Sequence, residues 1–273
     1  MSVVFLKVGQ GDSILVTTPN LNQVVIDTSP NETVVRQISK HLNYFDKTID
    51  MVISTHADLD HIGGLPSVID KYKITSHAYD FSTDESSLTR EIDRMSDEKR
   101  INKINLQAGD RIILDSQHDI YIDILWPTPE IKLKDKNDNS IVTRIVFNEV
   151  SFLLTGDASI EVEEFLIKGF ANNITNEDES NDISNSKIKS TVLKLGHHGS
   201  KTSTDSEFLE EVEPEFAVVS AGLDNKFGHP HQEVIETIKK YSPEVNILDN
   251  LYDSVRFETD GIKINVISAI HKK

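Results

Sequence analysis

The chain has 273 residues, of which 37% are hydrophobic and 27% charged, a composition that fits a globular protein and excludes a fibre or a fully disordered chain. It has no cysteine, which excludes disulfides, a thiol nucleophile and thiolate-bound metals. Lys and Arg number 28 against 45 Asp and Glu, and the net charge of −17 repels polyanions at long range. Any nucleic acid must therefore be held locally, by metal ions or by a confined basic patch.

The hydrophobic pattern also indicates where the protein works. No apolar run approaches the ~20 residues that a membrane-spanning helix needs. The first residues read directly into a strand, without the basic segment and small-residue cleavage site of a secretory signal. We therefore expect a cytoplasmic protein without a membrane span.

In chain order, apolar periodicity predicts two rounds of strands, a helix and a further strand. The first round has strands at 3–8, 13–17, 23–26 and 51–54 and helices at 33–42 and 62–71. A polar stretch at 84–103, read as a helix or a loop, leads to the second round. This round has strands at 111–114, 120–126, 141–147, 151–155, 191–195, 216–220, 245–248, 254–259 and 263–267, and helices at 160–169, 205–212 and 232–241.

The two rounds resemble an internal duplication, in which strands deliver polar groups at their C-terminal ends. Residues 24–27 correspond to 152–157, and residues 51–56 correspond to 192–197. We expect an α/β protein in which two mixed sheets pack face to face with helices outside. Both sets of strand ends would then meet at one edge.

One stretch breaks the pattern. Residues 171–189 are acidic and poor in hydrophobic residues, with runs of Asn, Asp, Glu and Ser. Such a composition cannot bury enough apolar surface to order itself. We expect a mobile surface loop within a single domain that spans residues 1–273.

The strongest chemical signal lies just past the strand at 51–54. His56, Asp58, Asp60 and His61 offer two imidazoles and two carboxylates within six residues. Such a segment suits divalent cations that accept nitrogen and oxygen ligands, such as Zn²⁺, Mn²⁺ or Fe²⁺. The alternative is a polar surface loop at a helix N-terminus, where Asp is favoured without any metal.

Two further segments place ligand-type residues after an apolar strand. Asp157 follows a buried strand and a glycine, and could equally be a helix N-cap. His197 and His198 are adjacent between glycines, a pattern that seldom serves packing and favours a metal or catalytic role.

A fourth segment holds His229 and His231 on either side of a proline. Its glycine and proline fix the loop, which suits residues that must be aimed, although an ordinary turn before a helix explains it equally well. Four histidines are isolated and are expected on the surface or in packing: His41, His77, His118 and His271.

Together these motifs resemble a known family. The run from His56 to Gly64 is similar to the metal signature of the metallo-β-lactamase superfamily, with Asp58 where most members carry a second His. Asp27 resembles the first motif of that superfamily, and Asp157 its metal-bridging Asp. More narrowly, the chain resembles the C-terminal hydrolase domain of the ComEC family of DNA-uptake proteins, with motifs in the same order at residues 8–12, 26–28, 56–64, 154–157, 197–203 and 228–231.

The resemblance implies a four-layer αββα sandwich with a dinuclear site for Zn²⁺ or Mn²⁺ at one edge. The first ion is expected to take His56 and Asp58, and the second Asp60, His61 and His198, with Asp157 bridging them. The third-motif His of the superfamily is missing, because residues 137–140 read Asn-Asp-Asn-Ser. A carboxylate, an amide or water is expected in its place.

The implied reaction is phosphodiester hydrolysis by a metal-activated water that attacks phosphorus in line. The expected catalytic residues are Asp60 at the second ion and three candidates for the donor to the phosphoryl and leaving oxygens: His197, Lys201 and His229. Asp27 is expected to orient a ligand. The surroundings of the site are expected to include Gln10, Asp12, Asn139, Ser140 and His231.

Three functions remain in competition. The first is a nuclease, the second a hydrolase of a small phosphodiester such as a cyclic nucleotide or of another ester or lactam, and the third a metal-binding module without turnover. The charge of −17 argues against long nucleic acid, whereas Lys194, Lys201 and Lys226 could form a local basic rim. The subfamily motifs favour the nuclease. A protein partner or a homo-oligomer is left open.

Overall fold

The computed structural model describes residues 1–43, 45–79, 86–131, 133, 135–172 and 188–268, and within them two mixed sheets. The first has eight strands in the order β15 (Ile264–Ser268), β14 (Val255–Thr259), β1 (Ser2–Phe5), β2 (Ile14–Thr17), β3 (Gln23–Ile26), β4 (Thr48–Ile53), β5 (Lys73–Ala78) and β6 (Asn102–Ile104). The second has seven in the order β13 (Asn246–Asp249), β12 (Phe216–Val219), β11 (Val192–Lys194), β10 (Val150–Leu154), β9 (Val142–Phe147), β8 (Ile120–Trp126) and β7 (Arg111–Asp115).

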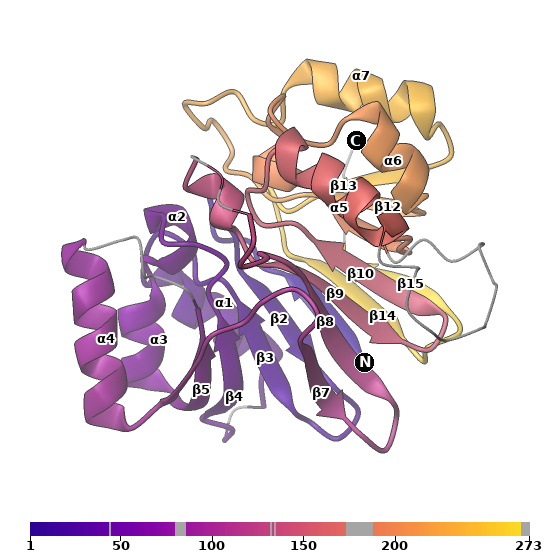
Figure 1. The fold of residues 1–273 in the computed structure, drawn as a ribbon. Coiled ribbons are helices and arrows are strands. Elements are labelled where there is room, and N and C mark those ends of the chain that lie inside the picture. Colours follow the sequence, from indigo (N-terminus) through magenta and orange to yellow (C-terminus); the bar gives the residue numbers. More distant parts are fainter. Residues whose placement is uncertain (44, 80–85, 132, 134, 173–187, 269–273) are drawn as a thin grey trace.

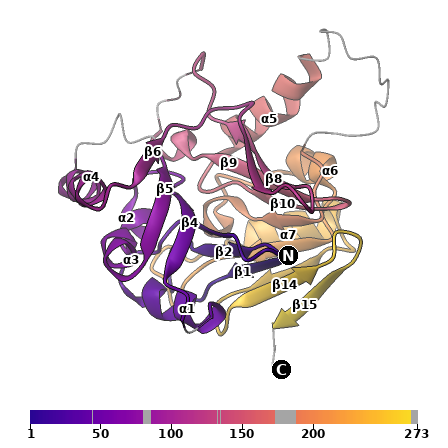
Figure 2. The ribbon, with the colours of Figure 1, turned by 90° about the horizontal axis from the view of Figure 1, so that it is seen from below.

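Helices lie outside both sheets (Figures 1 and 2). On the first sheet they are α1 (Thr33–His41), α2 (Leu59–Ile62), α3 (Leu65–Lys71) and α4 (Ser87–Lys99), and on the second α5 (Ile160–Asn172), α6 (Ser206–Val212) and α7 (Gln232–Tyr241). None of the described helices is long and apolar enough to cross a membrane. The expected α/β sandwich of four layers is confirmed.

Strand alternation builds the layers. In β1, Val3 and Phe5 point into the core between the sheets, whereas Val4 faces the helices of the first sheet. In β10, Phe152 joins the central core and Leu153 packs under the helices of the second sheet. Side chains alternate between the two faces of a strand. A strand that is apolar on both faces therefore buries one face between the sheets and the other under the helices.

Parallel pairs occur where the duplication was expected. In the first sheet β3 pairs with β4, and in the second β10 pairs with β11. The loops that follow β3, β4, β10 and β11 therefore lie at the C-terminal ends of parallel strands, which meet at one edge.

The structure departs from the expected elements in three places. The helix expected at 62–71 is two helices, α2 and α3, divided at Gly63 and Gly64. A Cβ at Gly63 would lie 2.3 Å from the Pro30 oxygen, and one at Gly64 would lie 2.2 Å from the Thr28 oxygen, so only glycine fits. Strands β5 and β6 were not predicted. The acidic segment expected to be mobile lies mostly outside the described residues.

Candidate metal centre

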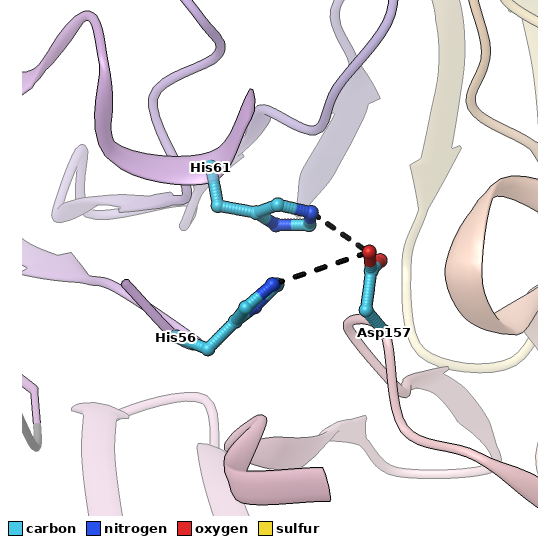
Figure 3. Close-up of side chains that lie close together, drawn as sticks. All are labelled: His56, His61 and Asp157. Carbon is cyan, nitrogen blue, oxygen red and sulfur yellow. Dashed lines mark ion pairs between the residues drawn. The ribbon is translucent and has the colours of Figure 1, made fainter. Parts of the chain in front are cut away.

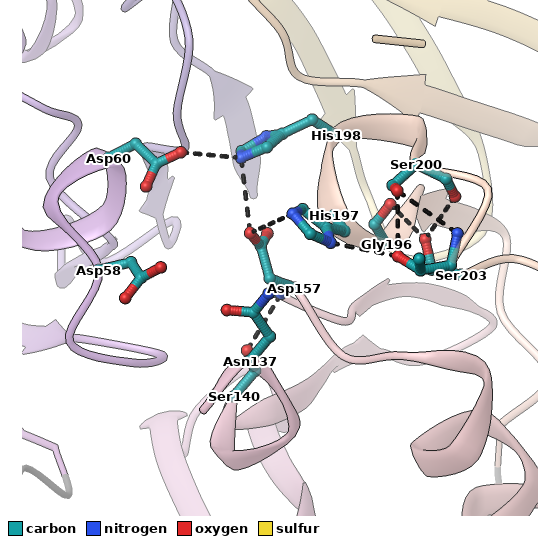
Figure 4. Close-up of polar contacts among 12 residues, drawn as sticks. Asp58, Asp60, Asn137, Ser140, Asp157, Gly196, His197, His198, Ser200 and Ser203 are labelled. Atoms are coloured by element: carbon teal, nitrogen blue, oxygen red, sulfur yellow. Dashed lines mark hydrogen bonds and ion pairs between the residues drawn. The ribbon is translucent and has the colours of Figure 1, made fainter. Parts of the chain in front are cut away.

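Polar side chains from both halves of the sandwich meet at this edge. His56 follows β4, Asp157 follows β10 and His198 follows β11. Helix α2, directly after the His56 loop, adds Asp60 and His61. Ligands of α/β sheets commonly gather beyond the C-terminal ends of the strands. The separate motifs of the sequence thus become one cluster (Figures 3 and 4).

The donor atoms of the cluster converge on the Asp157 carboxylate. His61 Nε2 lies 3.3 Å from Asp157 Oδ1, and His56 Nε2 lies 4.0 Å from Oδ2 (Figure 3). His198 Nε2 lies 3.6 Å from Asp157 Oδ2 and 3.4 Å from Asp60 Oδ2 (Figure 4). The three histidines and Asp157 are buried, and Asp60 is partly exposed.

Four of these buried atoms have no hydrogen-bond partner among the described residues, namely His56 Nε2, His61 Nε2, His198 Nε2 and Asp157 Oδ1. Leaving buried polar atoms unpaired is costly, so their convergence calls for a ligand. Ligand atoms around a tetrahedral ion with bonds of 2.0–2.2 Å lie about 3.4 Å apart, which is close to the separations observed.

Two of the four donor sets that the described residues form overlap at His61 and fit divalent ions with nitrogen and oxygen ligands. One contains His56, His61 and Asp157, and the other Asp60, His61 and His198. Within each set, ligand atoms all lie within 4.8 Å of one another. The presence of two ions, and their identity as Zn²⁺ or Mn²⁺, stay predictions.

Hydrogen bonds on the far side of each imidazole aim its other nitrogen at the centre. His61 Nδ1 lies 2.7 Å from Asp27 Oδ2, and Asp27 also accepts hydrogen bonds from the backbone N–H and the hydroxyl of Thr55. His198 Nδ1 lies 2.8 Å from the carbonyl oxygen of Ser220. Such outer partners fix the tautomer and the direction of a metal-binding histidine.

A buried ion pair lies behind the ligands. Lys194 Nζ is 2.7 Å from Asp12 Oδ2, and it donates to the carbonyl oxygens of Gly156 and Leu195. Asp12 Oδ1 is also 3.6 Å from His198 Nδ1. The expectation that Lys194 belongs to a basic rim is wrong, because its side chain is only 1% exposed.

The histidines and carboxylates of the cluster shift one another's pKa values. Burial alone would lower the pKa of His61, but Asp157 and Asp27 raise it well above its usual value. Burial would likewise lower the pKa of His198, but Asp157 and Asp12 raise it to about 9. Burial would raise the pKa of Asp157, yet His61 and His198 hold it well below its usual value. A bound dication would supply the same positive charge in place of these protons.

Three other imidazoles stay uncharged at neutral pH. Burial, and then the charge of His61, lowers the pKa of His56 to about 4. Burial, and then the charge of His198, lowers the pKa of His229 to about 4. Burial also lowers the pKa of His197. A neutral imidazole binds metal through one nitrogen or donates one N–H, so these residues are available as ligands or hydrogen-bond donors.

Asp58 differs from its expected position. It was predicted to share an ion with His56, but its carboxylate pairs with the Lys136 ammonium. Among the described residues, no donor set that fits a metal includes Asp58. His56 is instead grouped with His61 and Asp157.

Residues 137–140, which stand where most of the superfamily carries its third-motif histidine, contribute two polar side chains to the cluster. Ser140 Oγ lies 3.3 Å from His56 Nδ1 and accepts a hydrogen bond from the Asp157 backbone N–H. Asn137 has a buried Oδ1 without a hydrogen-bond partner in the described part of the chain, and it is drawn with this group in Figure 4. Asn139, the residue expected here, is partly exposed and ends the short 3₁₀ turn Asn137–Asn139.

The loop after β11 holds its two histidines in a strained backbone. His197 has φ 45° and His198 has φ 57°, both in the left-handed region. A non-glycine residue there costs of order 1–3 kcal/mol, which is tolerated where the surroundings enforce it. His197 Nε2 lies 3.6 Å from Asp157 Oδ2, and its side chain is 28% exposed.

Residues from other elements hold this loop in its conformation through hydrogen bonds. Glu163 on α5 accepts hydrogen bonds from the backbone N–H groups of Thr204 and Asp205 at 2.6 and 3.2 Å. His231 Nδ1 accepts one from the Lys201 backbone N–H at 3.0 Å, while the Lys201 side chain is exposed. Glu163 was not singled out from the sequence, where it is one of several acidic residues of a helix.

Gln10 and His229 are linked by the loop between β12 and α7, which carries His229. Gln10 Oε1 accepts a hydrogen bond from the Gly222 backbone N–H, in the loop that leads to His229. The ring centroid of His229 is 5.6 Å from that of His197 and 6.1 Å from that of His198.

The histidines expected to be isolated lie outside the cluster where they are described. His77 is buried and its Nε2 lies 2.9 Å from Ser54 Oγ. His118 Nδ1 lies 2.9 Å from Asp115 Oδ2. His41 is partly exposed at the end of α1, and His271 falls outside the described residues.

Comparison with known proteins places this site in context. A family model described as the metallo-beta-lactamase superfamily matches residues 6–222. ComE operon protein 3 of Bacillus subtilis (strain 168) is 28% identical over 257 residues, covering 88% of this chain and 31% of that protein. Competence protein ComA of Neisseria gonorrhoeae is 29% identical over 237 residues, covering 85% and 29%. The chain thus spans about a third of the length of the curated relatives it matches.

Solved structures share the fold at low identity. The metallo-beta-lactamase fold protein YhfI from Bacillus subtilis aligns with a TM-score of 0.59 and 11% identity, covering 94% of this chain and all of that one. Zn²⁺-bound PqqB from Methylobacterium extorquens aligns with a TM-score of 0.58 and 10% identity, covering 95% and 100%. A diphosphatase of the PhnP family has a TM-score of 0.51 and 12% identity, covering 95% and 98%.

Proposed function

The chain belongs to the metallo-β-lactamase superfamily, as its motifs predicted, and on that premise we propose that it is a metal-dependent phosphodiester hydrolase acting as a nuclease. One observation carries the proposal: His56, His61 and His198 aim buried nitrogens without hydrogen-bond partners in the described chain at one carboxylate, Asp157. The resemblance of the motifs to the ComEC family of DNA-uptake proteins supports the nuclease in particular, together with the similarity to ComE operon protein 3 and competence protein ComA over most of the chain.

In this proposal His56, His61 and Asp157 would hold one divalent ion, and Asp60 and His198 would hold a second, with Asp157 shared between them. Bound ions supply Lewis acidity for the phosphoryl group and make a water nucleophilic near neutral pH. Asn137 Oδ1, buried and without a hydrogen-bond partner among the described residues, is the candidate amide in place of the missing histidine. Asp58, paired with Lys136, is assigned no ion.

The remaining polar groups act on the substrate. His197 and His229 are neutral at pH 7, so each can donate an N–H hydrogen bond to a phosphoryl or leaving oxygen. His197 stands next to Asp157 with part of its ring exposed, which supports this role. Lys201 has an exposed ammonium without a carboxylate partner in the described chain and can hold a flanking phosphate.

The test is digestion by protein loaded with Mn²⁺ or with Zn²⁺. Single-stranded DNA, duplex DNA, RNA and a cyclic nucleotide are offered at low salt, with Asp157→Ala and His118→Ala as paired variants. We expect cleavage of nucleic acid by the native chain and by His118→Ala, and none by Asp157→Ala. Cleavage of the cyclic nucleotide alone would replace the nuclease with the small-substrate hydrolase. Bound metal without turnover of any substrate would favour a binding module.

A further inference from the structure

The loop between β12 and α7 forms one wall of the centre and is held in a defined shape. Asn225 Nδ2 donates to the carbonyl oxygens of Gly222 and His229, and Asn225 Oδ1 accepts from the His229 backbone N–H. Gln10 secures its start through the Gly222 N–H. A side chain on this loop is therefore fixed relative to the metal ligands.

This loop presents an aromatic ring to solvent beside the centre. Phe227 is 51% exposed, and its ring stacks on that of His229 with centroids 5.6 Å apart and planes 19° apart. His229 is in turn 6.1 Å from the His198 ring. The exposed ring of Phe227 is thus separated from a metal ligand by a single imidazole.

Positive charge lies at the same place. Lys226 Nζ is 5.0 Å from the centroid of the Phe227 ring and is exposed. Neither Lys226 nor Lys201 has a carboxylate partner within the described ranges, although acidic residues outnumber basic ones by 45 to 28. An exposed aromatic ring with an ammonium group beside it, as Phe227 has in Lys226, is the combination that binds single-stranded nucleic acid, through base stacking and phosphate contact.

We propose that Phe227 is a stacking platform for an unpaired nucleobase next to the scissile phosphodiester, and that Lys226 contacts the adjoining phosphate. This inference rests on the proposed nuclease function and names its substrate class, single-stranded nucleic acid. Bases inside a duplex already stack on their neighbours, so they reach the ring only after unpairing, which has a free-energy cost. Duplex DNA should therefore be bound mainly at frayed ends.

The experiment follows the fluorescence of 2-aminopurine placed at successive positions of a single-stranded oligonucleotide. This base is quenched when it stacks, and stopped-flow mixing with the metal-loaded chain records quenching before cleavage is read on a gel. We expect quenching with the native protein. Phe227→Ala should abolish the quenching and weaken binding about 5- to 150-fold, the range for loss of one stacked base. Phe227→Trp should retain both.

The matched control is Phe45→Ala, which removes an 87% exposed ring from the loop before β4, away from the strand ends that carry the site. It should change neither quenching nor affinity. An oligonucleotide that lacks the base at the quenched position should bind the native chain as weakly as the intact oligonucleotide binds Phe227→Ala. DNA and RNA versions are run in parallel to identify the sugar.

The outcomes separate the two proposals. Unchanged quenching in Phe227→Ala, or cleavage by the native chain without quenching at any position, would overturn the platform and leave the nuclease standing. Quenching that depends on Phe227 without cleavage under either metal would overturn the nuclease and leave the platform. Absence of both binding and cleavage would overturn both.

Discussion

Lys194 and Asp12 form an ion pair of 2.7 Å in the interior, and each side chain is no more than 2% exposed. Asp12 comes from the turn before β2 in the first sheet, and Lys194 ends β11 in the second. The pair therefore joins the two halves of the sandwich directly behind the candidate metal ligands. Burial would lower the pKa of Lys194, but Asp12 and Asp157 raise it, so the amine stays charged.

Removing the lysine should leave a buried charge without compensation. Lys194→Met is expected to lower the free energy of unfolding by about 3–5 kcal/mol, the cost of breaking a buried pair. Urea unfolding of the metal-free protein measures it. Lys189→Met, at a pair with Glu213 where both side chains are about half exposed, is the control and should cost no more than about 1 kcal/mol. An equal loss of unfolding free energy in the two variants would show that the interior pair contributes no more to stability than the exposed one.

Stability should depend on pH through Glu163. Burial raises its pKa from 4.5 to about 8, against two backbone N–H groups that lower it. The folded state then keeps a proton that the unfolded state releases, so stability is lost as the pH rises from about 4.5 to about 8, by at most about 1.4 kcal/mol per unit.

Glu163→Gln should remove this loss and gain stability relative to the native chain as the pH rises through that window. Unfolding at pH 5, 6.5 and 8 measures the difference. The matched control is Glu164→Gln, the same change at an exposed neighbour. Parallel pH profiles for the native chain and Glu163→Gln would rule out a proton on Glu163.

The adjacent histidines should divide their roles. His198 has its Nε2 among the ligand atoms, so His198→Ala is expected to lose metal and activity together. His197→Ala should keep its metal and slow turnover by about 10²–10⁴-fold, as for loss of a proton-transfer or donor group. Metal analysis beside kcat distinguishes them. The opposite pattern would reverse the assignment within the pair.

Nucleic acid affinity should fall only gently with salt. We assign phosphate contacts to two exposed lysines, Lys201 and Lys226, and each phosphate neutralised on a single strand contributes a slope of about −0.7 in log affinity against log salt. We expect a slope equivalent to two or three contacts, reduced by about one contact in Lys201→Ala with bound metal intact. Titrations between low and moderate salt measure it, and an identical slope in the variant would exclude Lys201 from phosphate contact.

The sequence was sufficient for most of the fold because apolar periodicity and glycine-rich turns are local signals. It also identified the ligand-type residues, since clustered His and Asp at strand ends have few structural uses. It failed for Lys194, because the motif beside it says nothing about which way a strand residue points. The partner, Asp12, lies far away in the sequence. The sequence likewise could not show that Asp58 pairs with Lys136, because Lys136 is contributed by a distant loop.

Metal content of Asp157→Ala tests the central claim most directly. Asp157 lies between His56 and His61 on one side and His198 on the other, so a carboxylate that bridges two ions is expected to be needed by both. Elemental analysis after saturation and desalting should find two ions per chain in the native protein and in His118→Ala, and almost none in Asp157→Ala. A metal content in Asp157→Ala equal to that of the native chain would contradict the bridged centre.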